Sequence, residues 1–295
     1  MTRHFGEDAG NWIKRFADIL KACVTRWDLE LGAPAEEQSM NYIVFAKTKA
    51  GADVALKIGV PHREMETEIE ALRYYGGRHC VRCLDADASL GALLLERVVP
   101  GRMLLSLHDN AQEATIAGQI MKKLLIKEPA EHNLPAFAQW VERAFGKLRS
   151  TYGRDCGPMP KALIDKAEQV FRDIAASTPN DMLLHGDLHH ENLLCDANQH
   201  WLAIDPKGVI GAACLEVGRF LQNQLPEGMT LGQMRQRIEQ RVQILSAELA
   251  ETPETIASSG FVDTVLCACW CVQERPDNDV ARNIAVAGLF DKMIP

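Results

Sequence analysis

Apolar residues in the N-terminal part of the chain recur at two different spacings. From Asn11 to Trp27 they follow a helical spacing, which predicts an amphipathic helix with one buried face. The stretches NYIVFAK (41–47) and DVALKIG (53–59) are short, rich in β-branched and aromatic residues, and flank a polar turn that contains Gly51. Because this composition around a glycine turn is typical of paired strands, the two stretches predict a β-hairpin.

A helix and a second pair of strands are predicted next. The segment HREMETEIEALRYY follows Pro61 and is closed by Gly76 and Gly77. Proline at the start of a helix and glycine just past its end are the expected boundaries. The stretches VRCLDAD (81–87) and ALLLERVV (92–99) then predict two more strands. The resulting order is an antiparallel sheet with one inserted helix.

The pattern changes after Pro100 and Gly101. Helical periodicity dominates residues 103–180, a short hairpin is predicted for 193–205, and the remainder to Pro295 is again helical. Proline followed by glycine is a typical breaker between structural units. We therefore predict an α+β fold with two lobes, an N-terminal lobe of residues 1–99 and a mainly helical C-terminal lobe of residues 100–295.

Composition and charge narrow the class of protein. The chain has 295 residues, 47% of them apolar and 24% charged, with a net charge of −8. This acidic balance argues against a nucleic-acid partner and suits a cationic small molecule. The N-terminal segment is too charged for a secretory signal, and no apolar run approaches the length of a membrane span. We expect a cytoplasmic protein without a membrane partner, as a monomer or weak dimer.

Nine cysteines, an odd number, agree with a reducing compartment. Cys80 and Cys83 have C-x-x-C spacing, but no second pair completes a zinc site and no thioredoxin-like context surrounds them. The cluster of Cys267, Cys269 and Cys271 lies in an apolar stretch, where cysteine behaves as a small core residue. We therefore expect reduced structural thiols.

The stretch HGDLHHEN (185–192) carries the first candidate chemistry. It reads H-x-D-x-x-x-x-N, the spacing of the catalytic loop of protein kinases, with Asp187 in the position of the base and Asn192 in that of a metal ligand. Asp205 ends the apolar strand WLAI, and the hairpin of residues 193–205 would bring it close to Asn192. Carboxylate and amide oxygens held rigidly in this way suit a Mg²⁺ ion that bridges phosphates.

A lysine and a glutamate that could hold a nucleotide lie upstream. Lys57 in VALKIG is comparable with the strand lysine of kinases, and an ion pair with Glu68 would hold its ammonium against the phosphates. Glu64 and Glu70 are weaker partners, since the apolar positions of the helix set a buried face that Glu68 borders. Backbone groups near Glu96 and Val98 could then bond an adenine edge between the lobes.

Two other interpretations of HGDLHHEN stay open on the residues alone. A zinc hydrolase could recruit His185, His189 and His190, although adjacent histidines point in different directions on most backbones and H-E-x-x-H is absent. The segment could also be a polar turn without chemistry. If it belongs to a kinase, we expect His185 to brace the loop and His189 or His190 to line the cleft.

The segments LLHGDLHHENLL and WLAIDPKGVIG resemble the aminoglycoside phosphotransferase superfamily, specifically its aminoglycoside/hydroxyurea antibiotic resistance kinase branch, to which streptomycin 6-kinases belong. Similar segments span most of residues 35–275. The resemblance implies a bilobal protein-kinase-like fold and phosphorylation of a small-molecule hydroxyl that depends on ATP and Mg²⁺. On this basis the acceptor would be an aminoglycoside such as streptomycin, or a compound like hydroxyurea.

Several departures from the kinase patterns bear on this expectation. The loop at Ser39, Met40 and Asn41 contains no glycine where a phosphate-binding loop is expected, and Asp205 is followed by Pro-Lys-Gly where protein kinases have Phe-Gly. The branch often has an aromatic-Asp pair where this chain has Leu215 and Glu216.

Acidic groups after residue 205 would face the acceptor, and Glu216 and Glu274 are the candidates. A kinase of another hydroxylated metabolite, and a nucleotide-binding regulator without turnover, are the alternative functions.

Overall fold

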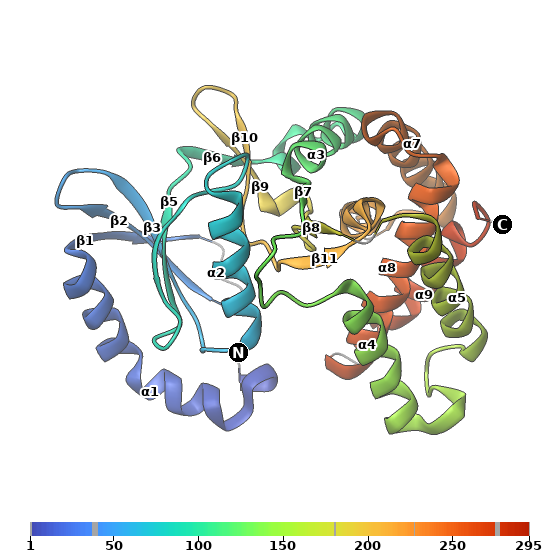
Figure 1. Cartoon of the computed structure of the whole chain (residues 1–295), viewed down its shortest axis with the longest axis horizontal. Coiled ribbons are helices and arrows are strands. Elements are labelled where there is room, and N and C mark those ends of the chain that lie inside the picture. The colour runs from blue at the N-terminus through green and yellow to red at the C-terminus, as the bar shows by residue number, and fades with distance from the viewer. Residues whose placement is uncertain (1, 37–40, 180, 227, 275–277, 295) are drawn as a thin grey trace.

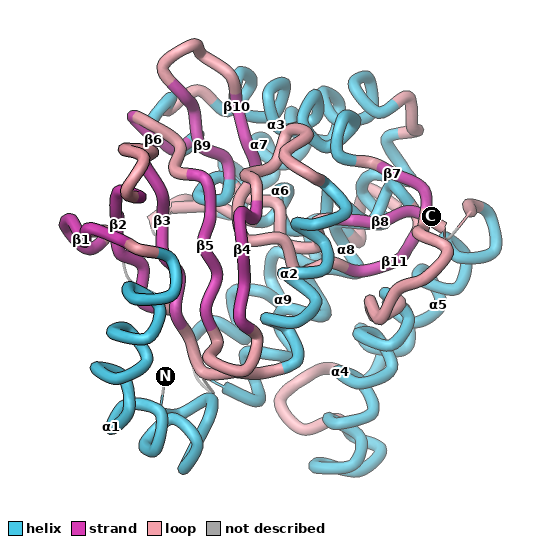
Figure 2. Tube along the Cα trace, turned by 60° about the vertical axis from the view of Figure 1, so that its left-hand side comes forward, coloured by secondary structure: helices cyan, strands magenta, loops and turns pink. Residues whose placement is uncertain are grey.

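The computed structural model describes residues 2–36, 41–179, 181–226, 228–274 and 278–294. A sheet-rich part lies beside a larger helical part (Figure 1). The first part consists of α1 (Thr2–Trp27), β1 (Leu29–Pro34), β2 (Tyr42–Thr48), β3 (Asp53–Ile58), α2 (Arg63–Tyr75), β4 (Cys83–Asp87) and β5 (Ala92–Glu96). Its strands form one antiparallel sheet in the order β1-β2-β3-β5-β4, side by side in Figure 2. The predicted sheet with one inserted helix is confirmed.

Strand β1 was not predicted. Only the first of its six residues, Leu29, is buried, and the other five are exposed. Because burial does not alternate along it, this strand lacks the period-two pattern by which strands are found in a sequence. It lies at the edge of the sheet, where backbone pairing to β2 suffices to hold it.

The two faces of this sheet contact different helices. Side chains on alternate positions of a strand point to opposite faces. Leu94 packs with α1 in one buried cluster, whereas its neighbours Leu93 and Leu95 pack with α2 and the helical part in another. Lys57 lies opposite Leu93 in the pairing of β3 with β5. The sheet therefore directs Lys57 toward α2 and away from α1.

The second part contains two small sheets among helices. Its elements are β6 (Pro100–Met103), α3 (Asn110–Leu124), β7 (Ile126–Lys127), α4 (Phe137–Tyr152), α5 (Lys161–Ser177), β8 (Met182–Leu184), β9 (Leu193–Asp196), β10 (Trp201–Ala203), β11 (Val209–Gly211), α6 (Gly218–Gln222), α7 (Leu231–Leu249), α8 (Pro253–Glu274) and α9 (Asn278–Phe290). The sheets have the orders β10-β9-β6 and β11-β8-β7. The hairpin predicted for residues 193–205 is present as β9 and β10. The division into lobes 1–99 and 100–295 stays a prediction.

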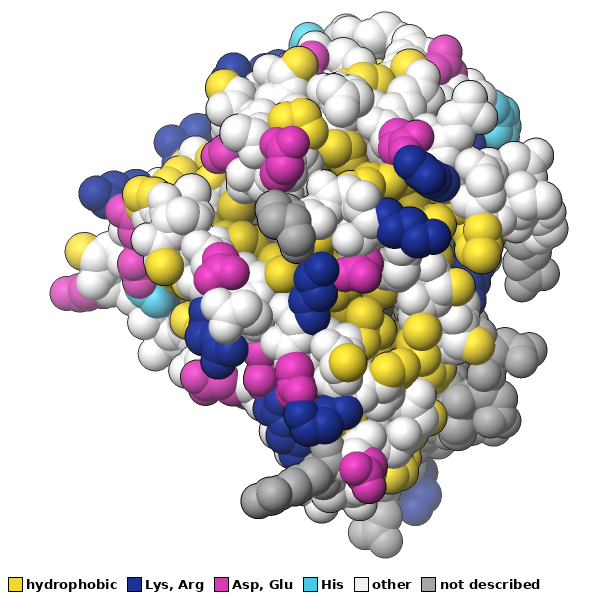
Figure 3. Space-filling view, turned by 90° about the vertical axis from the view of Figure 1, so that its right-hand side faces the viewer, with side chains coloured by type: hydrophobic (Ala, Val, Ile, Leu, Met, Phe, Trp, Pro, Cys, Tyr) yellow, Lys and Arg dark blue, Asp and Glu magenta, His cyan; other side chains and the backbone are white. Residues whose placement is uncertain are grey.

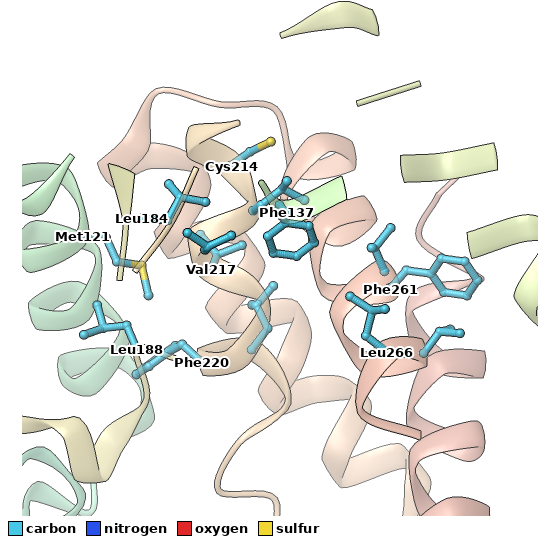
Figure 4. Close-up of a cluster of buried hydrophobic side chains, with 14 of the residues drawn as sticks. Met121, Phe137, Leu184, Leu188, Cys214, Val217, Phe220, Phe261 and Leu266 are labelled. Carbon is cyan, nitrogen blue, oxygen red and sulfur yellow. The ribbon is translucent and has the colours of Figure 1, made fainter. Parts of the chain in front are cut away.

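Helix α8 crosses the core of the helical part. Its residues Phe261 and Leu266 belong to the buried cluster that Figure 4 shows, together with Leu184 and Leu188 from either side of the HGD segment. The stretch Pro253–Val272 is long and apolar enough to cross a membrane by length and composition, which corrects the expectation that no run approaches that length. Since 78% of this stretch is buried inside the structure, it is accounted for as a core helix.

The cysteines are present as thiols, as the sequence predicts, and the surface carries charges of both signs. None of the nine cysteines, all of which lie in the described part of the chain, forms a disulfide, and Cys80 is fully buried. On the face shown in Figure 3, Lys and Arg side chains are interspersed with Asp and Glu. That a nucleic-acid partner is absent stays a prediction.

Candidate active site

Lys57 and Glu68 form a buried ion pair. Lys57 Nζ donates to both carboxylate oxygens of Glu68, at 2.7 and 2.8 Å, and the two residues are only 3% and 7% exposed. The neighbouring glutamates of α2 point elsewhere: Glu64 pairs with Lys207, and Glu70 accepts a hydrogen bond from the Asn133 backbone. Of these three glutamates, Glu68 is the partner of Lys57, as the spacing of the apolar residues in α2 predicts.

Asp205 completes this charged group from the other part of the chain. Its Oδ1 lies 3.2 Å from Lys57 Nζ, and its backbone has a left-handed φ of +58° directly after the β9–β10 hairpin. Burial opposes the charged forms of both groups, but their mutual attraction outweighs it: the pKa of Lys57 is raised and that of Asp205 is lowered. One ammonium therefore lies between two carboxylates from opposite parts of the molecule.

Residues on both sides of Asp187 fix the HGDLHHEN segment to the core. Leu188 is fully buried, and the His185 ring contacts the Ile204 carbonyl at 2.8 Å. Gly186 has a φ of +77°, and a Cβ at this position would lie 2.9 Å from the Trp140 ring, so only glycine fits here. The Asp187 side chain between these anchors remains 23% exposed.

Asn192 is held so that its amide oxygen could bind a metal. Its Nδ2 donates to the Asp187 carbonyl at 2.9 Å, so the nitrogen of the amide is bonded within the loop and the oxygen is left for a metal. The Ile204 N–H donates to the Asn192 carbonyl, and Asp205 follows Ile204 directly. Carboxylate and amide oxygens are hard donors of the kind that Mg²⁺ prefers. The residues present therefore fit such an ion.

The expectation that Glu216 faces the acceptor is wrong. Glu216 is 3% exposed, and its carboxylate accepts the N–H groups of His185 and Gly186 at 2.6 and 3.3 Å. It holds the backbone of the loop that presents Asp187, from the side of the core. The other candidate, Glu274, has a side chain outside the described residues, as do Ser39 and Met40 of the expected phosphate loop.

Substitution of Glu216 tests this positioning role. Glu216→Ala leaves two buried N–H groups without an acceptor, so the free energy of unfolding should fall by about 2–5 kcal/mol. Glu216→Gln keeps one acceptor oxygen and should cost less. Burial raises the pKa of Glu216 to about 8. The folded state therefore binds the proton more tightly than the unfolded state, and this stabilises the wild type in full at pH values below the ordinary carboxyl pKa. That contribution is lost as pH rises toward 8.

Denaturant unfolding at pH 5 and pH 8 measures both effects. The wild type should lose stability relative to Glu216→Gln between these two pH values. Equal stability of all three proteins would contradict the assignment.

The three histidines of the segment do not converge. His190 is fully buried, stacks on Phe220 with ring centroids 4.2 Å apart, and contacts Arg241, so it does not line the cleft. His189 contacts Glu191 and Asn192, while His185 braces the loop as expected. Burial lowers the pKa of His185 and of His190 to about 4. No group of three His, Cys, Asp or Glu side chains suited to a metal occurs among the described residues, which leaves the zinc hypothesis without support.

The segment after Asp205 is packed against α2. Gly208 has a φ of +70°, and a Cβ there would lie 2.8 Å from the Ala71 Cβ and 2.9 Å from the Thr67 carbonyl oxygen. Lys207 Nζ lies 3.1 Å from Glu64 on the exposed side of the same helix. The close approach of Gly208 to α2 keeps Glu68 and Asp205 within reach of Lys57.

Residues 26–274 match the family described as aminoglycoside/hydroxyurea antibiotic resistance kinase. The chain belongs to this family. Streptomycin 6-kinase from Streptomyces griseus is 26% identical over 99% of this chain and 94% of its own length. Hydroxyurea phosphotransferase from Kitasatospora aureofaciens is 33% identical over 72% of this chain and 62% of its own length. The present protein is thus a kinase that transfers a phosphoryl group to a hydroxyl.

Solved structures with low sequence identity share the fold. Choline kinase LicA from Streptococcus pneumoniae has a TM-score of 0.63 at 16% identity and covers 93% of this chain and 99% of its own. Aminoglycoside phosphotransferase APH(4)-Ia, in a ternary complex with ADP and hygromycin B, has a TM-score of 0.59 at 13% identity, over 92% and 96% of the two chains. These similarities confirm the predicted protein-kinase-like fold class.

The expected adenine contacts are only partly available in this kinase. The Glu96 backbone N–H donates to the Arg82 carbonyl at 2.9 Å, and the Glu96 carboxylate accepts the Arg82 N–H. The Glu96 N–H is therefore already used between β5 and the segment before β4. Val98, which is 8% exposed, follows at the connection between the two parts.

Arg219 was missed by the sequence analysis. It lies at the start of α6, and its Nε is 3.1 Å from Asp187 Oδ1, the candidate base of this kinase. A single arginine in a short helix carries no motif, and 32 residues separate the two along the chain. No spacing rule could have connected them before the fold was known.

Proposed function

We propose that this kinase transfers the γ-phosphate of ATP to a hydroxyl of a small acceptor of the streptomycin or hydroxyurea type. One observation carries the proposal: Lys57, bonded to Glu68 of α2, also lies 3.2 Å from Asp205 of the helical part. Phosphoryl transfer needs a cation and a metal site fixed in one position, because catalysis rests on placement and charge neutralisation. The nucleotide would lie between the two parts.

Each residue has a separate role in this proposal. Lys57 binds the α- and β-phosphates and is kept in place by Glu68. Asn192 and Asp205 would hold Mg²⁺, which supplies neutralisation of the phosphate charges when it is bound. Asp187 orients the acceptor hydroxyl and takes its proton while the acceptor oxygen bonds to phosphorus and the bond to the ADP oxygen breaks. We assign the adenine edge to the backbone at Val98 and to the Glu96 carbonyl.

Release of ADP from ATP and Mg²⁺ over a panel of acceptors tests the function. The panel contains hydroxyurea, streptomycin, other aminoglycosides and simple hydroxylated metabolites, each with a matched reaction in excess chelator. We expect release that depends on an acceptor and disappears when the chelator removes Mg²⁺. Mass spectrometry of the product should show one added phosphate.

Two results would overturn the proposal. Nucleotide binding without turnover on any acceptor would favour the silent regulator. If only a metabolite unlike streptomycin and hydroxyurea is phosphorylated, the proposed kinase chemistry is correct and the proposed acceptor is wrong. The cytoplasmic location and the monomeric or weakly dimeric state stay predictions.

A further inference from the structure

Arg219 occupies a half-buried cluster beside the candidate base. Its Nη2 lies 3.8 Å from Asp263 Oδ1 on α8, and its guanidinium carbon is 5.4 Å from the ring centroid of Trp270 on the same helix. Trp270 meets Trp140 edge to face, with centroids 6.3 Å apart, and Trp140 packs on Gly186. The Arg219 cluster, defined as Arg219, Asp187, Asp263, Trp140 and Trp270, therefore adjoins the expected position of the acceptor hydroxyl.

The groups around Arg219 are those that bind a cationic ligand. Organic cations are held by a carboxylate together with an aromatic face. Here Asp263, which is 6% exposed, and the face of Trp270 are both directed at the chain's own guanidinium. The second oxygen of Asp263 accepts a hydrogen bond from Gln222, so both carboxylate oxygens already have a partner within the protein.

A cationic group entering the cluster would lie next to the like-charged guanidinium of Arg219, with which both carboxylates of the cluster already pair. To pair with Asp263, it would have to displace the guanidinium in a poorly solvated position, and it would gain only the ion pair that Arg219 loses. The Arg219 side chain itself is 22% exposed, so it faces the solvent-accessible side as well as Asp187. A neutral acceptor meets neither penalty.

We propose that Arg219 is an internal cation that selects acceptors without positive charge at the reacting end. This inference rests on the proposed function, because it takes Asp187 as the group that receives the hydroxyl. It narrows the acceptor to neutral hydroxyl or N-hydroxy compounds of the hydroxyurea type, and disfavours acceptors that carry guanidinium groups, such as streptomycin. Arg219 also restrains the Asp187 carboxylate, as a positioning residue.

Acceptor selectivity in Arg219→Ala tests the inference, with Arg235→Ala as the matched control. Arg235 is an exposed arginine of α7 that pairs with Glu239. We compare kcat/KM for streptomycin with kcat/KM for hydroxyurea in each protein. The wild type should favour hydroxyurea, and the ratio of streptomycin to hydroxyurea should rise about tenfold or more in Arg219→Ala alone, because like charges no longer meet. An unchanged ratio, or a wild type that favours streptomycin, overturns the inference.

A binding measurement separates this inference from the proposed function. Methylguanidinium and its neutral analogue methylurea are titrated at low millimolar concentration, and binding is followed by intrinsic tryptophan fluorescence, to which Trp140 and Trp270 contribute two of the five tryptophans. Arg219→Ala should bind methylguanidinium at least about tenfold more tightly than the wild type, with methylurea unchanged. Addition of Asp263→Asn should remove the gain.

These titrations need no turnover, so they decide the role of Arg219 even if every acceptor fails. Equal affinity in wild type and variant would refute it. Arg219→Gln, which keeps an amide donor and most of the side-chain length, serves if the alanine variant fails to fold.

Discussion

Asp187→Asn is expected to lower kcat by about 10²- to 10⁴-fold, the usual contribution of a general base. Asparagine has a similar shape and can still orient a hydroxyl, but its amide cannot take up the proton. The contacts that we propose for Lys57 and Asp205 with the nucleotide are untouched, so KM for ATP should change little. The loss therefore belongs to the chemical step and not to nucleotide binding.

Single-turnover kinetics with a saturating acceptor measure this loss directly. Asp173→Asn, an exposed position of α5, is the control and should keep wild-type rates. Because Arg219 loses the negative charge it faces at Asp187, thermal unfolding is followed in parallel to separate a change in stability from a change in rate. A variant that is well folded and retains more than about a tenth of the wild-type kcat would show that Asp187 is not the base.

The Lys57–Glu68 pair could be predicted because the information is local. Met65, Ile69 and Leu72 set the buried face of α2, and Glu68 borders that face. The strand that carries Lys57 is recognisable from the segment VALKIG itself. The HGDLHHEN spacing works in the same way, since eight consecutive residues fix the relation of Asp187 to Asn192. Local periodicity and a short loop therefore suffice for four of the candidate site residues, namely Lys57, Glu68, Asp187 and Asn192.

The partners that hold the loop could not be predicted, because they arrive from distant segments. In the sequence, Glu216 is indistinguishable from the other acidic residues after Asp205. Only the folded chain shows that its buried carboxylate accepts two backbone N–H groups. Arg241 is similar: it is fully buried and donates to the carbonyls of Phe220, Leu221 and Asn223. Buried polar residues that bond to distant backbone groups leave no periodic trace in the sequence, because only the fold brings donor and acceptor together.

Helix α6 connects the loop of the candidate base to the core. Arg241 fixes the carbonyls at the end of α6, and Arg219 at its start reaches Asp187. Glu216, just before α6, holds the backbone of the same loop. Helix α6 and the turn directly before it thus hold the candidate base through one contact each, while the proposed metal and phosphate ligands depend on β3, α2 and the β9–β10 hairpin. Substitutions in the two groups should therefore affect different kinetic constants.

Asp205→Asn is the clearest test of the second group. Asp205 is the assigned carboxylate ligand of Mg²⁺ and also the second carboxylate beside Lys57. An asparagine keeps the shape but removes the charge that neutralises both cations. We expect kcat/KM for ATP to fall by about 100- to 1000-fold, the scale of losing one electrostatic contact to the transferring group. The Mg²⁺ concentration needed for half-maximal rate should rise.

Titration of the initial rate with ATP at saturating Mg²⁺ measures kcat/KM, and titration with Mg²⁺ at fixed ATP measures the half-maximal Mg²⁺ concentration. Asp53→Asn, at an exposed carboxylate of β3 that pairs with Lys47, provides the control. Lys57 keeps Glu68 in the variant, so the fold should persist with a modest loss of thermal stability. Acceptor KM should remain near the wild-type value, because α6 and Asp187 are unaltered. If Asp205→Asn shows the wild-type dependence on Mg²⁺, the ion is held elsewhere and the carboxylate serves only to pair with Lys57.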